Sequence, residues 1–105
     1  MPYGEAPAGK GAFKVYRNGH IIEVKIYRVP ASKKNPLGYR FRCFMVKATS
    51  GEEIVGYDNH WPKGPHRHFR GREESYSFQN IETLLNDFKR DCEDVLKEVD
   101  ENETS

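Results

Sequence analysis

Three of the four histidines in this chain, His60, His66 and His68, fall within nine residues. Imidazole can accept or donate a proton near neutral pH, and arginine and lysine side chains bind phosphate groups. Near the histidines lie four cations, Lys63, Arg67, Arg70 and Arg72, and the tryptophan Trp61. Three residues that stiffen or turn the chain, Pro62, Gly64 and Pro65, stand among them. This combination in one segment, called the histidine loop below (residues 57–70), favours a functional site over core packing.

The histidine loop suits the metal-independent cleavage of an RNA phosphodiester. That reaction needs a base for the 2′-hydroxyl, an acid for the leaving 5′-oxygen and positive charge near the phosphate. If the end of the loop is extended, the side chains of His66, His68 and Arg70 share one face. His60 would approach that face across the loop, and Asp58 would orient a histidine through its ring N–H. The candidate catalytic residues are therefore His66, His68, His60 and Asp58.

Substrate contacts are expected from cationic, aromatic and amide side chains. Between Lys10 and Lys47 there are ten Lys or Arg and a single acid, Glu23, which favours a surface that faces a polyanion. An aromatic ring, from Trp61, Tyr57 or Phe69, could stack on a base. The candidate substrate-binding residues are Arg67, Arg70, Lys63, Tyr57, Asn59, Arg40 and Arg42. Loop capping is the structural alternative for Asn59.

Two other functions stay open for the same loop. His60, His66 and His68 could bind a metal ion, with Asp58 as a fourth ligand, because neutral imidazole is a good zinc ligand. No Cys or Glu joins this set, and the neighbouring Lys63 and Arg67 would repel a dication, so metal binding ranks behind phosphate chemistry and no cofactor is expected. The loop could also bind nucleic acid or a regulator without turnover. In the structural alternative, the histidines only hydrogen-bond within a rigid Pro-Gly turn.

The elements that must position the loop are strands followed by one helix. The dipeptide Asn18-Gly19 predicts a hairpin between strands at 12–17 and 20–29, because a type I′ turn needs positive φ at both positions. Alternating apolar residues predict further strands at 39–48 and 54–58. Residues 66–70 can run extended, and residues 71–74 are expected to form a turn.

Apolar residues at helical spacing follow Asn80, a good helix N-cap, and predict a helix that ends at Val99. The fold class is therefore α+β: an antiparallel meander of four to five strands packed on one C-terminal α-helix.

The chain length of 105 residues indicates one domain. A flexible arm is expected at residues 1–11, the domain at 12–99 and an acidic disordered tail at 100–105.

No apolar run approaches the ~20 residues of a membrane span, so a cytoplasmic protein with no membrane partner is expected. Cys43 and Cys92 lie on apolar faces, which predicts buried free thiols. The oligomeric state stays open, a homodimer included.

Three segments of the chain resemble the TumE family of small bacterial and archaeal proteins, which are toxins of type II toxin–antitoxin pairs. The segments are Tyr57-Asp58-Asn59-His60, Pro65-His66-Arg67-His68, and Tyr76-Ser77-Phe78 before the helix with Leu84-Leu85-x-x-Phe88. The resemblance covers about residues 20–97. At the family's motif positions stand Tyr57, Asp58, Asn59, His66 and His68. Trp61-Pro62-Lys63 lies in a variable part, and the first 11 residues lie outside the resemblance.

The resemblance implies a small cytoplasmic toxin and a helix-turn-helix antitoxin that binds it and represses their operon. It leaves the chemistry of the toxin open. Together with the histidine loop, it leads to the expectation of a toxin that acts on RNA as a ribonuclease. The rival expectation is a non-catalytic partner of nucleic acid or of a transcription regulator.

Overall fold

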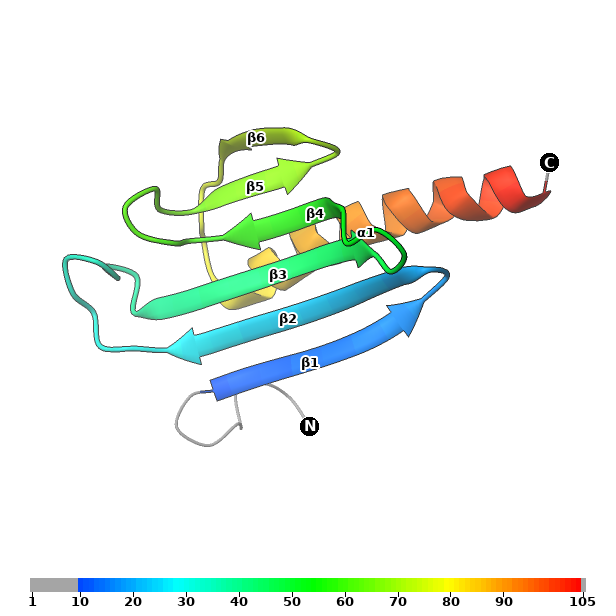
Figure 1. The fold of residues 1–105 in the computed structure, drawn as a ribbon. Coiled ribbons are helices and arrows are strands. Elements are labelled where there is room, and N and C mark those ends of the chain that lie inside the picture. The colour runs from blue at the N-terminus through cyan, green and yellow to red at the C-terminus, as the bar shows by residue number, and fades with distance from the viewer. Residues whose placement is uncertain (1–9, 105) are drawn as a thin grey trace.

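The computed structural model describes residues 10–104, and residues 1–9 and 105 lie outside the described part of the chain. Within residues 10–104, six antiparallel strands form one sheet in sequential order, followed by one helix (Figure 1). The elements are β1 (Lys10–Arg17), β2 (His20–Arg28), β3 (Tyr39–Lys47), β4 (Glu53–Asp58), β5 (His66–Phe69), β6 (Arg72–Ser75) and α1 (Ile81–Thr104). The α+β meander with a C-terminal helix is confirmed, and the expected four to five strands are corrected to six.

The first hairpin forms as its sequence predicts. Asn18 and Gly19 have φ angles of 49° and 81°, and Arg17 pairs directly with His20 across the turn. Positive φ at both central positions is the mark of the type I′ turn, whose twist matches that of the flanking strands. This turn sets the register of β1 against β2.

The additional strand, β6, occupies residues that were expected to form a turn. Its sequence is Arg-Glu-Glu-Ser, and all four residues are exposed, so no apolar alternation marks it as a strand. The actual turn is Arg70-Gly71, with φ angles of 52° and 83°, a second two-residue hairpin turn. As a result, Glu73 lies directly opposite His68 on β5.

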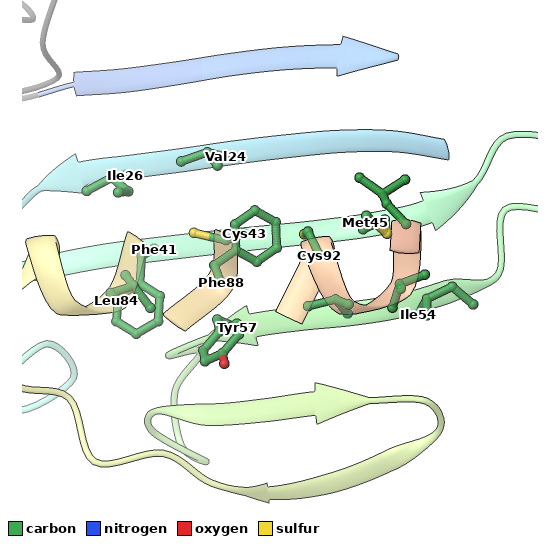
Figure 2. Packing of buried hydrophobic residues seen from close by; sticks show 13 residues of the cluster. Val24, Ile26, Phe41, Cys43, Met45, Ile54, Tyr57, Leu84, Phe88 and Cys92 are labelled. Carbon is green, nitrogen blue, oxygen red and sulfur yellow. The ribbon is translucent and has the colours of Figure 1, made fainter. Parts of the chain in front are cut away.

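Helix α1 covers one face of the sheet, where it packs against β3 and β4 (Figure 1). The alternate residues of β3 that face it are buried, as their apolar spacing predicts. Figure 2 shows these side chains meeting those of the helix in one cluster, which includes Phe41, Cys43, Met45, Leu84, Phe88 and Cys92. Both cysteines are buried and free, as predicted.

The helix begins where predicted and ends later than predicted. The Asn80 side-chain oxygen accepts the backbone N–H of Thr83 at 2.8 Å, which confirms the N-cap. The helix continues past Val99 to Thr104, which corrects its predicted end at Val99, because no Gly or Pro follows Val99 to stop it. Residue 105 of the expected acidic tail lies outside the described residues. Residues 1–9 of the expected N-terminal arm lie outside the described residues, and residues 10 and 11 belong to β1.

The face of the sheet opposite α1, called the open face below, carries no helix in the described part of the chain (Figure 1). Residues of β3, β4 and β5 that alternate with the buried ones must point to this face. Within residues 10–104 there is no helix long and apolar enough to cross a bilayer.

Candidate functional site

Strand register gathers chemically active side chains on the open face. Asp58 on β4 lies opposite Arg42 on β3 and opposite His66 on β5. One row further, His68 lies opposite Gly56, which has no side chain to fill the space between the strands. The intervening residues of β3 and β4, including Cys43 and Tyr57, are buried on the helix side. The open face therefore has a row of charged and titratable groups beside a gap.

A cleft of about 560 Å³ lies over this gap. Its walls include most of the residues that the sequence singles out: Arg40, Arg42, Asp58, His60, Lys63, His66 and His68. The loop between β4 and β5 therefore folds back and brings His60 into the same cleft as the two histidines of β5. The cations Arg40, Arg42 and Lys63 outnumber the lining carboxylates of Glu53 and Asp58. The cleft is thus suited to an anionic ligand.

His66 and His68 are the central pair of the cleft. Their ring centroids are 5.4 Å apart with the rings edge-on, and both residues are half-buried. The Nδ1 atom of His66 lies 2.9 Å from the carbonyl oxygen of Gly64. A carbonyl can only accept, so Nδ1 donates and Nε2 of the neutral ring is left as a proton acceptor. The backbone of the loop thus fixes the tautomer that a general base needs.

His68 has a different partner, the carboxylate of Glu73. Nε2 of His68 on β5 lies 3.4 Å from Oε1 of Glu73 on β6, the strand that the sequence did not reveal. The carboxylate also forms a close ion pair with the ammonium of Lys63. The hydrogen bond from Lys63 lowers the pKa of Glu73 from its ordinary value, so this group stays ionised at neutral pH. The Glu73 carboxylate can therefore accept a hydrogen bond from Nε2 of His68.

Asp58 and His60 hold the start of the loop. The Asp58 carboxylate accepts the backbone N–H of His60 at 2.5 Å, so it caps the loop, whereas the sequence suggested a contact with a histidine ring. The guanidinium of Arg40 lies 3.3 Å from Nδ1 of His60 and donates to it. His60 is exposed and Arg40 half-buried. Both side chains therefore line the rim of the cleft in a defined orientation.

Arg42 is positioned from two sides. Its guanidinium lies 4.6 Å from the ring centroid of Phe44 and 3.6 Å from the carboxylate of Glu53. The Glu53 side chain folds over Gly56, where a methyl group would collide with its carboxylate. Gly56 thus leaves room for Glu53, and Glu53 in turn steers Arg42 toward the cleft. This pair is exposed enough that an anionic ligand could compete for Arg42.

A metal-ligating set also exists in the described residues, and its carboxylate is Glu73, whereas the sequence suggested Asp58. The ligand atoms of His66, His68 and Glu73 all lie within 4.8 Å of one another. Two imidazoles and one carboxylate can hold a divalent transition-metal ion. The ion pair between Lys63 and Glu73 competes with that use of the carboxylate. Glu73 was not predicted as a site residue, because the Arg70-Gly71 turn is the one feature of the sequence which indicates that residues 72–75 pair with β5.

The family model for the toxin TumE matches residues 7–96 of this chain. The chain belongs to the TumE toxin family. The match begins before β1, so it includes residues 7–19, which lie outside the resemblance seen in the sequence. Membership in the TumE family indicates a toxin of a toxin–antitoxin system and implies an antitoxin partner. No curated protein and no solved structure matches the chain.

Two predicted site residues of this TumE-family chain, Tyr57 and Arg67, lie on the helix side of the sheet. The Tyr57 hydroxyl donates to the carboxylate of Asp91 at 2.5 Å, and Arg67 Nε donates to the same carboxylate at 2.8 Å. Burial and the Asp91 charge raise the pKa of Tyr57. The Tyr57 backbone borders the cleft, but its side chain belongs to the core. A signal for Asp91 existed in the sequence, since its spacing from Phe88 and Val95 places it within the apolar stripe.

Two further candidates, Asn59 and Arg70, have structural partners. Asn59 is buried: its side-chain oxygen accepts the Phe41 N–H at 3.0 Å and its amide donates to the Tyr39 carbonyl at 2.7 Å. Arg70 lies in the β5–β6 turn and forms an ion pair of 2.7 Å with Glu98 of the helix. Asn59 and Arg70 therefore do not line the cleft, and their side chains hold neighbouring elements together instead.

Proposed function

We propose that this TumE-family protein is a toxin that cleaves RNA as a metal-independent endoribonuclease, acting in the cytoplasm through the open-face cleft. The observation that supports the proposal best is the pairing of His66 with His68 in a cleft walled by Arg40, Arg42 and Lys63. Proton transfer and charge neutralisation are the two requirements of phosphodiester cleavage. Both are met by side chains within one cavity.

In the proposed reaction His66 is the base and His68 the acid. Nε2 of His66 takes the proton of the ribose 2′-hydroxyl while the 2′-oxygen attacks phosphorus. The bond from phosphorus to the 5′-oxygen breaks, and His68 gives its proton to that oxygen, which leaves as a hydroxyl. The assignment rests on the partners of the two rings, because Gly64 leaves Nε2 of His66 as a proton acceptor, whereas Nε2 of His68 faces the Glu73 carboxylate and so carries a proton to donate.

The phosphate is proposed to bind between Arg40 and Arg42. Arginine presents planar donors that match phosphate oxygens, and it stays charged throughout the pH range of catalysis. His60 and Asp58 support this arrangement, since His60 accepts a hydrogen bond from Arg40 and Asp58 caps the loop that carries His60. Arg67 and Arg70, the sequence's other candidates for the phosphate, are left out of the proposed site because neither lines the cleft and each forms an ion pair with a carboxylate of the helix.

Metal-dependent hydrolysis is a second candidate, motivated by the cluster of His66, His68 and Glu73. It ranks second because Lys63 occupies the carboxylate and two arginines line the same cleft. The third candidate is binding without turnover, either of nucleic acid or of a regulator. The antitoxin partner is proposed to be a helix-turn-helix protein, as the family resemblance implies.

One experiment separates the three candidates. Purified protein is incubated with 5′-labelled single-stranded RNA, with and without a chelator, beside the double variant His66→Ala/His68→Ala and the control Tyr16→Ala on exposed β1. We expect cleavage by wild type and control in both conditions and none by the double variant. Undiminished cleavage by a folded double variant would overturn the proposed catalysis, and expression of the same variants in cells would show whether growth arrest follows cleavage.

A further inference from the structure

A second cavity, of about 280 Å³, adjoins the histidine loop on its other side. It lies between the β2–β3 loop and the β4–β5 loop, which project from the same end of the sheet (Figure 1). Its apolar walls are made by Leu37, Trp61, Pro62, Pro65 and Phe78. Lys33 and Lys34 add two cations at its border. A flat, uncharged group attached to an anion would match this composition.

Exposed apolar side chains gather at this cavity. Trp61 is 43% exposed and Leu37 is 39% exposed, whereas the other large hydrophobics with comparable exposure in the described residues all lie on β1. Scattered exposed apolar residues are normal, but two that line one cavity beside two lysines point to a ligand. Opposite them, Phe78 is held in place because its ring stacks on Phe41 at 5.4 Å. The cavity thus has one fixed aromatic wall and one exposed indole.

The cavity and the catalytic cleft share the histidine loop as a common wall. His60 lines the cleft and the next residue, Trp61, lines the cavity. At the other end of the loop, Pro65 lines the cavity and His66 lines the cleft. The loop is closed by a hydrogen bond of 3.0 Å from Gly64 N–H to the His60 carbonyl. A chain molecule could therefore place one group in the cleft and its neighbouring group in the cavity.

We propose that this cavity is a nucleobase subsite, in which Trp61 stacks on a base of single-stranded RNA whose phosphate lies between Arg40 and Arg42. The proposal rests on the proposed function, because it takes the phosphate in the cleft as its anchor. Aromatic stacking is a general means of holding unpaired bases, and every base has a suitable face. Lys33 and Lys34 would contact the next phosphate along the strand. The volume lies just below that of sites for drug-sized ligands, at roughly 300–1,000 Å³, and suits a single base.

The subsite should tolerate different bases. Among the described lining residues, the neutral side chain able to read a base edge is Asn59, and both ends of its amide are engaged by the backbone of Tyr39 and Phe41. The remaining walls are apolar or cationic, so they offer no pattern of donors and acceptors matched to one base. We therefore infer stacking without sequence readout at this position.

Trp61 is the only tryptophan of the chain, so its fluorescence reports on this cavity directly. The double variant His66→Ala/His68→Ala is titrated with a short single-stranded RNA of mixed sequence, and then with the same strand lacking its bases. We expect saturable quenching by the RNA and little quenching by the base-free strand. Replacing Trp61 by Ala in this background should weaken RNA binding roughly 5- to 150-fold in a filter assay, the range of one stacked base.

Two further variants keep the test decisive. Trp61→Phe should retain most of the affinity, because it keeps a ring for stacking, and Tyr16→Ala on β1 should retain all of it. Equal affinity of Trp61→Ala and the parent would overturn the subsite even if wild type cleaves RNA. Quenching in the double variant without any cleavage by wild type would support the subsite and overturn the ribonuclease. Quenching by the purified antitoxin and not by RNA would overturn the subsite in favour of a protein-docking surface.

Discussion

Arg67 lies between the two histidines of the cleft in sequence, yet its Nε donates to the carboxylate of Asp91 on the opposite side of the sheet, at 2.8 Å. Asp91 is only 2% exposed, and the Tyr57 hydroxyl is its second donor. Because side chains alternate along a strand, tying Arg67 to the helix turns His66 and His68 toward the open face. The ion pair thus anchors β5, a strand of four residues that are all half-buried.

Removing Arg67 should destabilise the protein strongly. Arg67→Ala removes the shorter of the two ion pairs of the buried Asp91 carboxylate, which keeps the Tyr57 hydroxyl and a pair of 3.7 Å with Arg90, and breaking a buried pair in this way costs about 3–5 kcal/mol. Urea denaturation would measure the loss in the free energy of unfolding. Arg72→Ala, an exposed arginine on β6, is the matched control and should change it by less than about 0.5 kcal/mol.

The double variant Arg67→Met/Asp91→Leu tests whether the charge left behind is the cause. Replacing both partners by apolar residues of similar size also removes the buried carboxylate that lost its main partner, so most of the stability lost in Arg67→Ala should return. A double variant as unstable as Arg67→Ala would contradict this account and would point to lost packing instead.

The two histidines should contribute separate limbs to the pH dependence of cleavage. His66 must be neutral to act as base and His68 protonated to act as acid, so kcat/KM should pass through a maximum as pH rises. His66→Ala and His68→Ala should each lower kcat/KM by roughly 10²- to 10⁴-fold. His66→Ala should lose the acidic limb of the profile and His68→Ala the basic limb. Identical profiles for the two variants would contradict the assignment of base and acid.

The strands with apolar alternation and the helix could be predicted from the sequence, and β6 could not. Alternation marks a strand only when one of its faces is buried, and the four residues of β6 are all exposed. Its position depends on the Arg70-Gly71 turn and on cross-strand contacts such as that of His68 with Glu73, which become visible only in the folded protein. The missing strand concealed Glu73, the carboxylate that lies 3.4 Å from His68.

The residue types of the candidate site could be predicted from the sequence, but the face of the sheet to which each side chain points could not. The crowding of histidines and cations identified the loop, and its three histidines and Lys63 line the cleft. The sequence could not show which cations remain available to a ligand, because the partners of Arg67 and Arg70 lie on a helix far away along the chain. Sequence spacing identifies neighbours on one strand, whereas a buried ion pair depends on how separate elements pack.

Arg40 and Arg42 should each contribute one phosphate contact to RNA binding. For single strands, each contact changes the slope of log affinity against log salt concentration by about 0.7. Arg40→Gln and Arg42→Gln, in the inactive double-histidine background, should each lower the slope by that amount. The control is Arg28→Gln, since Arg28 follows the alternation of the buried Val24 and Ile26 and so lies outside the open face. An unchanged slope in both arginine variants would place the phosphate elsewhere.

Zinc ions should inhibit cleavage, although a zinc-ligating set is present. A dication bound by His66, His68 and Glu73 would occupy the imidazole nitrogens that act as base and acid. Rates measured across a zinc titration should fall, a chelator should restore them, and Glu73→Gln should weaken the inhibition because one ligand is lost. Activity that disappears with chelator and returns with a divalent cation would instead establish the metal-dependent candidate.

Stability should decline in alkaline solution because of the two buried thiols. Burial raises the pKa of Cys43 and of Cys92 from 9.0 to about 12. Above pH 9 the unfolded chain therefore releases two protons that the folded protein keeps, so rising pH favours unfolding. The loss is about 1.4 kcal/mol per thiol for each pH unit between the two values. Below pH 9 the thiols are protonated in both states and contribute no slope.

The measurement that checks this is the free energy of urea unfolding at several values between about pH 8 and about pH 9.5, where the unfolded thiols ionise and most tyrosine, with a pKa of about 10, does not. Above that range the buried Tyr57 and the half-buried Tyr76, whose pKa values are also raised, would add to the slope. The variant Cys43→Ala/Cys92→Ala should be less stable than wild type at pH 8, because it leaves cavities in the core. Its stability should nevertheless change much less with pH. Since both thiols are buried, they should also react with a thiol reagent only at the rate of unfolding. Equal pH slopes in the variant and the wild type would show that groups other than Cys43 and Cys92 cause the alkaline loss.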